Sequence, residues 1–335
     1  MELKKLCAVL GAALTAASSI AASEAHAQAT STGSGQAYPT KPIRLICPFP
    51  PGGTTDIVAR IVAQGLTEAW GHQVIVDNRP GAGALIGTEM AAKSPPDGYT
   101  VLLGSITTHA VNPALHKKLN FDPINDFSPV TLVVSSPQLL AVNPTVAAKS
   151  VKELIALAKA KPGQLNYASA GAGSSPHLTF ELFKSATGID MRHVPYKGTG
   201  PAITELVGGQ VQGMITGVVA LMPHVKSGKL RALAVTSKGR VGVLPDVPTI
   251  MESGVPNFDV SSWFGVFLPA GTPKPIVAKM NGQIRKIVET PQVQKRLIDL
   301  GADPETNTPE QFAAYVKSEK TRWGKVVQDT GARID

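Results

Sequence analysis

Four short segments of the sequence combine glycine with serine or threonine where a strand is expected to pass into a helix. They are Pro48–Asp56 (PFPPGGTTD), Gly104–Asn112 (GSITTHAVN), Ala168–His177 (ASAGAGSSPH) and Ile215–Val218 (ITGV). Glycine lets the backbone approach a ligand closely, and the first amide groups of a helix have no partner inside the helix. With the hydroxyl donors added, such segments can hold a carboxylate or phosphate without any lysine or arginine.

Each segment taken alone is explained equally well as an ordinary strand-to-helix turn with a capping residue. Four of them in one chain favour a binding cleft in which loops from two units face the same anion. We expect the ligand to bind first at the helix start Gly52–Asp56, after which the helix start Gly171–Ser175 closes over it. Closure would then be a population shift driven by a ligand that bridges both units.

No signature of catalysis or of cofactor binding fits the sequence. The Gly81–Gly87 run has the spacing G-x-G-x-x-x-G and follows the second expected strand, which favours a tight turn over a dinucleotide loop. There is no Walker loop and no G-x-S-x-G elbow. Cys47 lies inside an expected strand and is interpreted as a buried small apolar residue. We therefore expect no enzyme activity, no catalytic residue, no cofactor and no metal.

The histidines of the chain show no metal-ligand spacing, and each is expected to be a surface or capping residue. Two of them, His109 and His177, lie in the candidate ligand loops and remain candidates for contact with the ligand. The histidines that follow the first 27 residues are His72, His109, His116, His177, His193 and His224.

Composition narrows the class of partner. Hydrophobic residues make up 43% of the chain and charged residues 17%, which is typical of a globular protein. The net charge is +8, but the basic residues are dispersed and aromatic residues are only 5%, which argues against nucleic-acid binding. A diffuse positive field is instead suited to attracting small anions.

The first 27 residues have the pattern of a cleaved signal peptide. Lys4 and Lys5 precede the apolar stretch Leu6–Ile20, and Ala25–Ala27 fits the small-x-small cleavage motif. A membrane anchor is the alternative, but the apolar run is shorter than the ~20 residues that a span needs. Residues 28–38 are rich in Ser, Thr, Gly and Gln and are interpreted as a flexible leader. The sequence thus predicts a periplasmic protein cleaved near Ala27.

Hydrophobic patterns beyond the leader alternate between strands and helices. Strands are expected at 43–49, 74–76 and 99–103, with helices at 56–70 and 84–93 between them, which predicts a parallel sheet. Two extended runs follow on either side of Pro137. A second α/β unit occupies the middle of the chain, and a strand at 262–268 precedes a helical C-terminal part. About 300 residues remain after cleavage, which suits two lobes of ordinary size.

Several longer runs resemble one family in order along the chain. They are YPTKPIRLICPFPPGGTTDIVARIVAQGL, VIVDNRPGAGALIGTEMAAKSPPDGYTVLLG, LNYASAGAGSSPHL, VPYKGTGPAITELVGGQV, LPDVPTIMESG and GVFLPAGTP. Together they resemble the substrate-binding proteins of tripartite tricarboxylate transporters, the Bug-type periplasmic receptors. The resemblance extends over nearly all of residues 38–335.

This resemblance implies an α/β, two-lobe periplasmic-binding-protein fold of the Venus-flytrap type, type II-like. Residues 39–138 and 262–335 would form lobe 1 and residues 139–261 would form lobe 2, with crossing strands near 137–142 and 260–266. The implied function is to capture a small organic acid (a di- or tricarboxylate or an aromatic acid) and to deliver it to membrane permease subunits. We expect the receptor to be a monomer.

Members of the family hold a carboxylate with loop amides, hydroxyls and bridging waters. In the first lobe the resemblance assigns the ligand to Pro51, Gly52, Gly53, Thr54, Thr55, Asp56, Ser105, Thr107, Thr108 and His109. In the second lobe it assigns the ligand to Ala170, Gly171, Gly173, Ser174, Ser175, His177, Lys197, Gly198, Thr216 and Gly217.

One position departs from the family pattern. Many relatives carry an acidic residue where this chain has Met214, and the absence of an acid there disfavours a ligand with an amino group. Asp56 could supply a negative charge, but as a helix-start residue it is expected to be structural. Two other functions stay open from the sequence: an exported hydrolase or isomerase on the same scaffold, and a sensory partner that presents its ligand to a membrane receptor.

Overall fold

The computed structural model describes residues 38–116 and 118–330. The predicted signal peptide, residues 1–27, and the leader up to residue 37 lie outside the described residues. The elements named here all belong to the compact unit that begins at Lys41. No helix in the described ranges combines the length and the apolar character that a membrane crossing requires.

The N-terminal part of this unit is the predicted series of βα repeats. Strands β1 (Ile43–Cys47), β2 (Val74–Asn78) and β3 (Thr100–Ser105) pair in parallel, and helices α2 (Thr54–Trp70) and α3 (Leu85–Ala92) connect them. Helix α2 turns Val58, Ile61 and Leu66 inward because they recur at helical spacing. It ends at Gly71, whose φ of 69° places it in the left-handed region that favours glycine.

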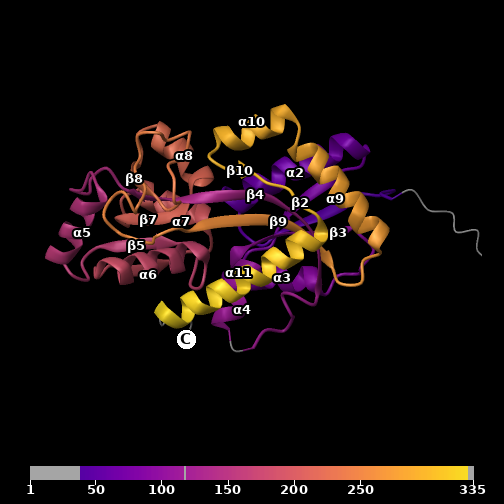
Figure 1. Cartoon of the computed structure of the whole chain (residues 1–335), viewed down its shortest axis with the longest axis horizontal. Coiled ribbons are helices and arrows are strands. Elements are labelled where there is room, and N and C mark those ends of the chain that lie inside the picture. The colour runs from indigo at the N-terminus through magenta and orange to yellow at the C-terminus, as the bar shows by residue number, and fades with distance from the viewer. Residues whose placement is uncertain (1–37, 117, 331–335) are drawn as a thin grey trace, which may run out of the picture. The chain divides into compact units, whose positions relative to one another are not determined.

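A single long strand links this part to the middle of the chain. Strand β4 (Phe127–Val142) pairs through its first part with β9 (Ser261–Pro269) and β10 (Asp303–Pro304), and through its second part with β7 (Gly213–Gly217) and β8 (Arg231–Val235). Figure 1 shows β4 and β9 side by side between the two groups of helices. The sequence predicted two separate runs around Pro137, but the structure has one continuous strand.

The middle of the chain is the second predicted α/β unit. Strands β5 (Asn166–Ser169), β6 (Arg192–Pro195) and β7 pair in parallel, and the strand order of the sheet is β2-β1-β3-β9-β4-β7-β5-β6. The helices of this unit are α5 (Val151–Ala160), α6 (Ser175–Thr187), α7 (Thr199–Val207) and α8 (Val218–Lys226). The sheet is therefore parallel within each unit and antiparallel where β4 and β9 join them.

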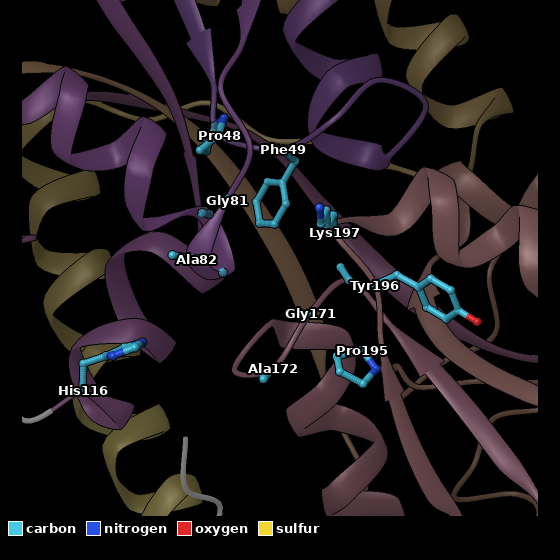
Figure 2. A pocket seen from close by; sticks show the side chains of 13 residues that line it. Pro48, Phe49, Gly81, Ala82, His116, Gly171, Ala172, Pro195, Tyr196 and Lys197 are labelled. Carbon is cyan, nitrogen blue, oxygen red and sulfur yellow. The ribbon is translucent and has the colours of Figure 1, made fainter. Parts of the chain in front are cut away.

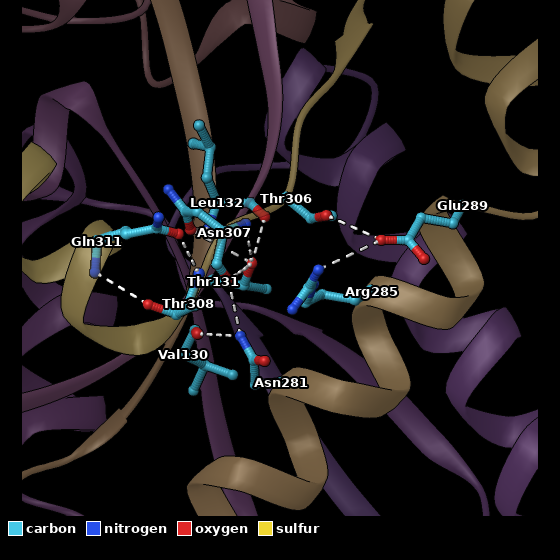
Figure 3. Close-up of polar contacts among 10 residues, drawn as sticks. All are labelled: Val130, Thr131, Leu132, Asn281, Arg285, Glu289, Thr306, Asn307, Thr308 and Gln311. Carbon is cyan, nitrogen blue, oxygen red and sulfur yellow. Dashed lines mark hydrogen bonds and ion pairs between the residues drawn. The ribbon is translucent and has the colours of Figure 1, made fainter.

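The C-terminal helices return to the first unit. They are α9 (Lys274–Val288), α10 (Pro291–Asp299) and α11 (Pro309–Thr330). A network of hydrogen bonds ties the segment before α11 to β4 (Figure 3): Asn281 Nδ2 donates to the carbonyls of Val130 (2.8 Å) and Asn307 (2.9 Å). Thr308 and Gln311 form a capping box at the start of α11, since each backbone amide donates to the other residue's side chain.

Candidate functional site

A small polar chamber lies where loops of the N-terminal βα repeats meet loops of the second α/β unit, in the middle of the chain. Its volume is about 30 Å³, which is room for roughly two water-sized groups. The residues around it come from both units and from strand β9. They are Phe49, Thr54, Thr55, Ser105, Ile106, Thr107, Ala170, Ser175, Pro176, Thr199, Thr216, Gly217, Ser262 and Phe264.

Four helices begin at the wall of this chamber. Helices α2, α6 and α7 start at Thr54, Ser175 and Thr199, and Gly217 caps α8. The first amides of each helix lack partners within the helix and carry positive partial charge. No aspartate or glutamate lines the chamber among the described residues. The chamber is therefore suited to one small anionic group.

Two hydroxyls at the chamber are buried without any hydrogen-bond partner in the described part of the chain, namely Thr54 Oγ1 and Ser105 Oγ. Their residues are 5% and 2% exposed. A buried polar atom without a hydrogen-bond partner destabilises the folded protein by roughly 1–3 kcal/mol. Two such hydroxyls at one chamber therefore indicate that a bound ligand supplies their hydrogen bonds. The Thr107 hydroxyl, by contrast, is engaged, since the Ser175 amide donates to Thr107 Oγ1 at 3.1 Å.

Asp56 organises the first loop and does not line the chamber. Its carboxylate accepts hydrogen bonds from the Gly52 amide (3.1 Å), from Arg60 Nε (3.0 Å) and from Asn78 Nδ2 (3.0 Å). Burial raises the pKa of Asp56, but these three hydrogen bonds outweigh burial and hold the pKa below its usual range. The carboxylate thus stays charged and fixes the loop that presents Thr54.

Glycines allow the two units to touch around the chamber. A Cβ added to Gly217 would lie 2.6 Å from Thr54 Oγ1, and one added to Gly200 would lie 2.5 Å from the Pro51 carbonyl oxygen. The first loop and the starts of α7 and α8 are therefore in contact, and a side chain at either glycine would separate them.

The structure brings eight of the sequence-predicted residues to the chamber. They are Thr54, Thr55, Ser105, Thr107, Ala170, Ser175, Thr216 and Gly217. Gly171 and Lys197 line a larger neighbouring cavity of about 360 Å³ (Figure 2). Pro51, Gly52, Gly53 and Gly198 lie in the contact between the first loop and α7.

The remaining predicted residues support the loops. Ser174 Oγ donates to the Gly171 carbonyl, which closes the turn before α6. His177 Nδ1 accepts from the Gly173 amide at 3.1 Å, and its ring stacks on His193 with 4.0 Å between the centroids. Neither His177 nor Ser174 lines either cavity.

His109 is buried among aromatic rings beside the chamber. Its ring stacks on Phe267 at 3.8 Å and meets the edge of Phe127, and its Nδ1 lies 2.7 Å from Thr108 Oγ1. The residue is fully buried, and burial lowers the pKa of His109 from 6.5 to about 3. The Ser105 amide donates to Thr108 Oγ1, which His109 contacts in turn. His109 and Thr108 therefore hold Ser105 in position at the chamber wall.

The burial of His109 predicts a pH-dependent stability. Its pKa is lower in the folded than in the unfolded chain, so the unfolded chain binds the extra proton below pH 6.5. The stabilisation is complete above pH 6.5 and is lost as the pH falls toward 3. We expect the unfolding free energy to drop by about 2 kcal/mol between pH 7 and pH 5 from this group. Urea unfolding of wild type and His109→Phe at both pH values measures it.

A His72→Gln variant is the matched control, because it removes an imidazole that is not fully buried. The drop should persist in the control and shrink in His109→Phe. Burial also lowers the pKa of His193, to about 4, but that contribution is common to all three proteins and cancels in the comparison. An equal drop in His109→Phe would contradict the role given to His109.

Three residues of the chamber, Thr199, Ser262 and Phe264, lie outside the four loops that the sequence singled out. Thr199 follows Gly198 at the start of α7, and the glycine-hydroxyl pair was the available signal. Ser262 and Phe264 come from β9, where a strand pattern carries no sign of ligand contact.

The departure noted at Met214 does not bear on the charge of the chamber. Met214 is fully buried and packs in the apolar core of the second unit, with Leu139, Ala168 and Leu206. The chamber is reached two residues later along β7, at Thr216.

The chain is similar to known transporter receptors in sequence and in fold. The family described as "Tripartite tricarboxylate transporter family receptor" matches residues 58–332. Protein BugT of Bordetella pertussis is 41% identical over 302 residues, which cover 90% of this chain and 93% of BugT. A solved structure from R. palustris with adipate has a TM-score of 0.87 and 37% identity, over 89% of this chain and 100% of that one.

A second solved structure is MatC from Rhodopseudomonas palustris with bound malate. It has a TM-score of 0.83 and 36% identity, over 87% of this chain and 100% of MatC. The periplasmic binding protein BugD likewise superimposes with a TM-score of 0.85. The predicted two-lobe periplasmic-binding-protein fold is thereby confirmed.

Proposed function

This chain belongs to the tripartite tricarboxylate transporter receptor family, and from that membership we propose that it is a periplasmic receptor for a small carboxylate-bearing solute. The receptor delivers the solute to the membrane subunits of a tripartite tricarboxylate-type transporter and does no chemistry on it. It acts as a monomer after cleavage near Ala27.

The observation that carries the proposal concerns the Thr54 and Ser105 hydroxyls: among the described residues they have no hydrogen-bond partner, and no acidic residue lines their chamber. A carboxylate accepts several hydrogen bonds at once, and those from helix-start amides and hydroxyls are charge-assisted. The chamber has room for a group of a few heavy atoms. A carboxylate matches the chamber in charge, in size and in the donors that it requires.

The solved relatives support the class of ligand. One of them contains adipate and another contains malate, both of which are small dicarboxylates. On this basis we assign to this chain a small di- or tricarboxylate or an aromatic acid whose carboxylate enters the chamber.

The mechanism of capture follows from the placement of the chamber between two lobes. We assign residues 39–138 and 262–335 to lobe 1 and residues 139–261 to lobe 2. The pairing of β4 supports this division, because Pro137 pairs with β9 and Gln138 pairs with β7. A ligand that bonds to Thr54 and Ser105 of lobe 1 and to the helix starts of lobe 2 favours the closed arrangement.

Binding without turnover is the expected result for wild-type protein. Mass spectrometry of acids that co-purify, followed by calorimetry with those acids and with malate and adipate, should find an acid bound at one site. The recovered acid should be chemically unchanged after long incubation. Conversion of the acid to a product would instead support the exported enzyme, and failure of every carboxylate to bind would end the proposal.

A further inference from the structure

The larger cavity of about 360 Å³ adjoins the carboxylate chamber, and Phe49 and Ala170 line both spaces. We propose that this cavity is the second part of the ligand site: it takes the apolar body of an extended acid, whose far end carries an anionic group that pairs with Lys197. The inference rests on the proposed function, since it assumes that the first carboxylate occupies the chamber.

The two volumes divide the ligand into a head and a body. The chamber of about 30 Å³ has room for a carboxylate but not for a carbon skeleton of several atoms. The neighbouring cavity of about 360 Å³ lies within the usual range for small-molecule sites. Figure 2 shows the Phe49 ring pointing into this cavity between Gly81 and Lys197, and Phe49 also lines the chamber, so this residue lies where the two spaces adjoin.

The walls of the larger cavity are mainly apolar side chains and backbone. They are formed by Pro48, Phe49, Gly81, Ala82, Gly83, Ala84, His116, Ala170, Gly171, Ala172, Pro195, Tyr196 and Lys197. The Tyr196 ring points away from the cavity (Figure 2). Such walls favour hydrocarbon, whether an aliphatic chain or an aromatic ring.

The charge at this cavity has one sign. No aspartate or glutamate belongs to its described lining. Lys197 is exposed and forms no ion pair with any residue in the described ranges. Burial lowers the pKa of His116, which leaves Lys197 as the cation of this wall. A second anionic group on the ligand would find its partner there.

Both units contribute to the cavity, so its size is set when they meet. A Cβ added to Gly83 would lie 3.2 Å from the carbonyl oxygen of Ala172, which comes from the opposite loop. The Gly83 loop is fixed from behind, because Asn112 Nδ2 donates to the Gly83 carbonyl at 2.9 Å. Ala82 and Ala84, on either side of Gly83, both have a positive φ. This conformation is unfavourable for alanine, so it persists only where the surrounding structure holds the loop in place. Ligand length should therefore be selected at this wall.

The charge is tested with two acids that differ only at the far end. We compare adipate, a six-carbon dicarboxylate, with hexanoate, which has a methyl group in place of the second carboxylate. Lys197→Gln should weaken adipate binding by about three- to tenfold and leave hexanoate binding unchanged, because Lys197 is exposed and its ion pair is partly screened. Lys159→Gln, on the exposed face of α5, is the control for net charge and should change neither affinity.

The body of the ligand is tested by filling the cavity. Ala172 lies on the wall, is exposed and, unlike Ala82, does not have a positive φ, so Ala172→Phe places a ring in the space without straining the backbone or disturbing the core. Adipate and hexanoate should lose at least about tenfold in affinity, whereas acetate, measured by competition, should bind as it does to wild type. The thermal unfolding of the variant establishes that it folds.

The outcomes separate the inference from the function beneath it. If adipate, hexanoate, acetate, malate and the acids that co-purify all fail to bind wild-type protein, the proposed function is wrong. If a carboxylate binds, but Lys197→Gln weakens hexanoate binding as much as adipate binding, or Ala172→Phe leaves adipate binding intact, the receptor function stands and the proposed second part of the site is wrong.

Discussion

Replacing Gly217 with valine is expected to lower the affinity for a carboxylate by about a hundredfold or more while the protein still folds. The backbone of Gly217 has φ −52° and ψ 134°, a conformation that any residue adopts, so the substitution strains nothing locally. A Cβ there would lie 2.6 Å from Thr54 Oγ1 on the other side of the chamber. The two lobes of the variant should therefore be unable to close around the ligand.

The size of the loss follows from the bonds that an open protein cannot make. A ligand held by one lobe gives up at least two charge-assisted hydrogen bonds, each worth ~1.5–3 kcal/mol, which is on the order of a hundredfold or more in affinity. Calorimetry with the acid that co-purifies measures this loss. Gly242→Val is the control, because a Cβ at Gly242 meets nothing within 4 Å. Binding of wild-type strength by Gly217→Val would contradict closure at this contact.

Removing the two unpartnered hydroxyls is expected to have opposite effects on binding and on stability. Thr54→Val and Ser105→Ala should each lower the affinity for a carboxylate by about tenfold or more, since each loses one charge-assisted hydrogen bond. The same variants should be as stable as the wild type without ligand, or more stable by up to about 1 kcal/mol, because the hydroxyls have no partner among the described residues. Calorimetry and urea unfolding measure the two quantities.

Thr131→Val supplies the matched control for a hydroxyl that the fold uses. Thr131 Oγ1 donates to the Leu132 carbonyl at 2.8 Å and accepts from the Asn307 amide at 3.2 Å, away from the chamber. This variant should lose stability and keep its affinity, which reverses the pattern of Thr54→Val. If Thr54→Val lost stability and kept its affinity, its hydroxyl would be structural and the site would lie elsewhere.

Much of the architecture could be predicted because it depends on local sequence patterns. The βα repeats, the capping box at Thr308 and the glycine end of α2 depend on residues close together in the sequence. The loops with glycine and hydroxyl residues could also be recognised, since a strand followed by a helix start places Thr54 and Ser175 at the edge of a sheet. These features brought eight predicted residues to the chamber.

The features that sequence reasoning missed depend on partners far away in the chain. Strand β4 continues through Pro137 because β9 pairs with one part of it and β7 with the other. His109 has the same local sequence signal as Thr107, but the rings of Phe127 and Phe267 determine that it is buried. Ser262 reaches the chamber from within a strand, where alternation gives no sign of ligand contact.

The most direct test of the account is a crystal structure of the protein with the acid that co-purifies with it. We predict one carboxylate in the chamber, within hydrogen-bond distance of Thr54 Oγ1 and Ser105 Oγ and of amides at the starts of helices from both lobes. The acid bound at another place on the protein, with these two hydroxyls still unpartnered, would contradict it.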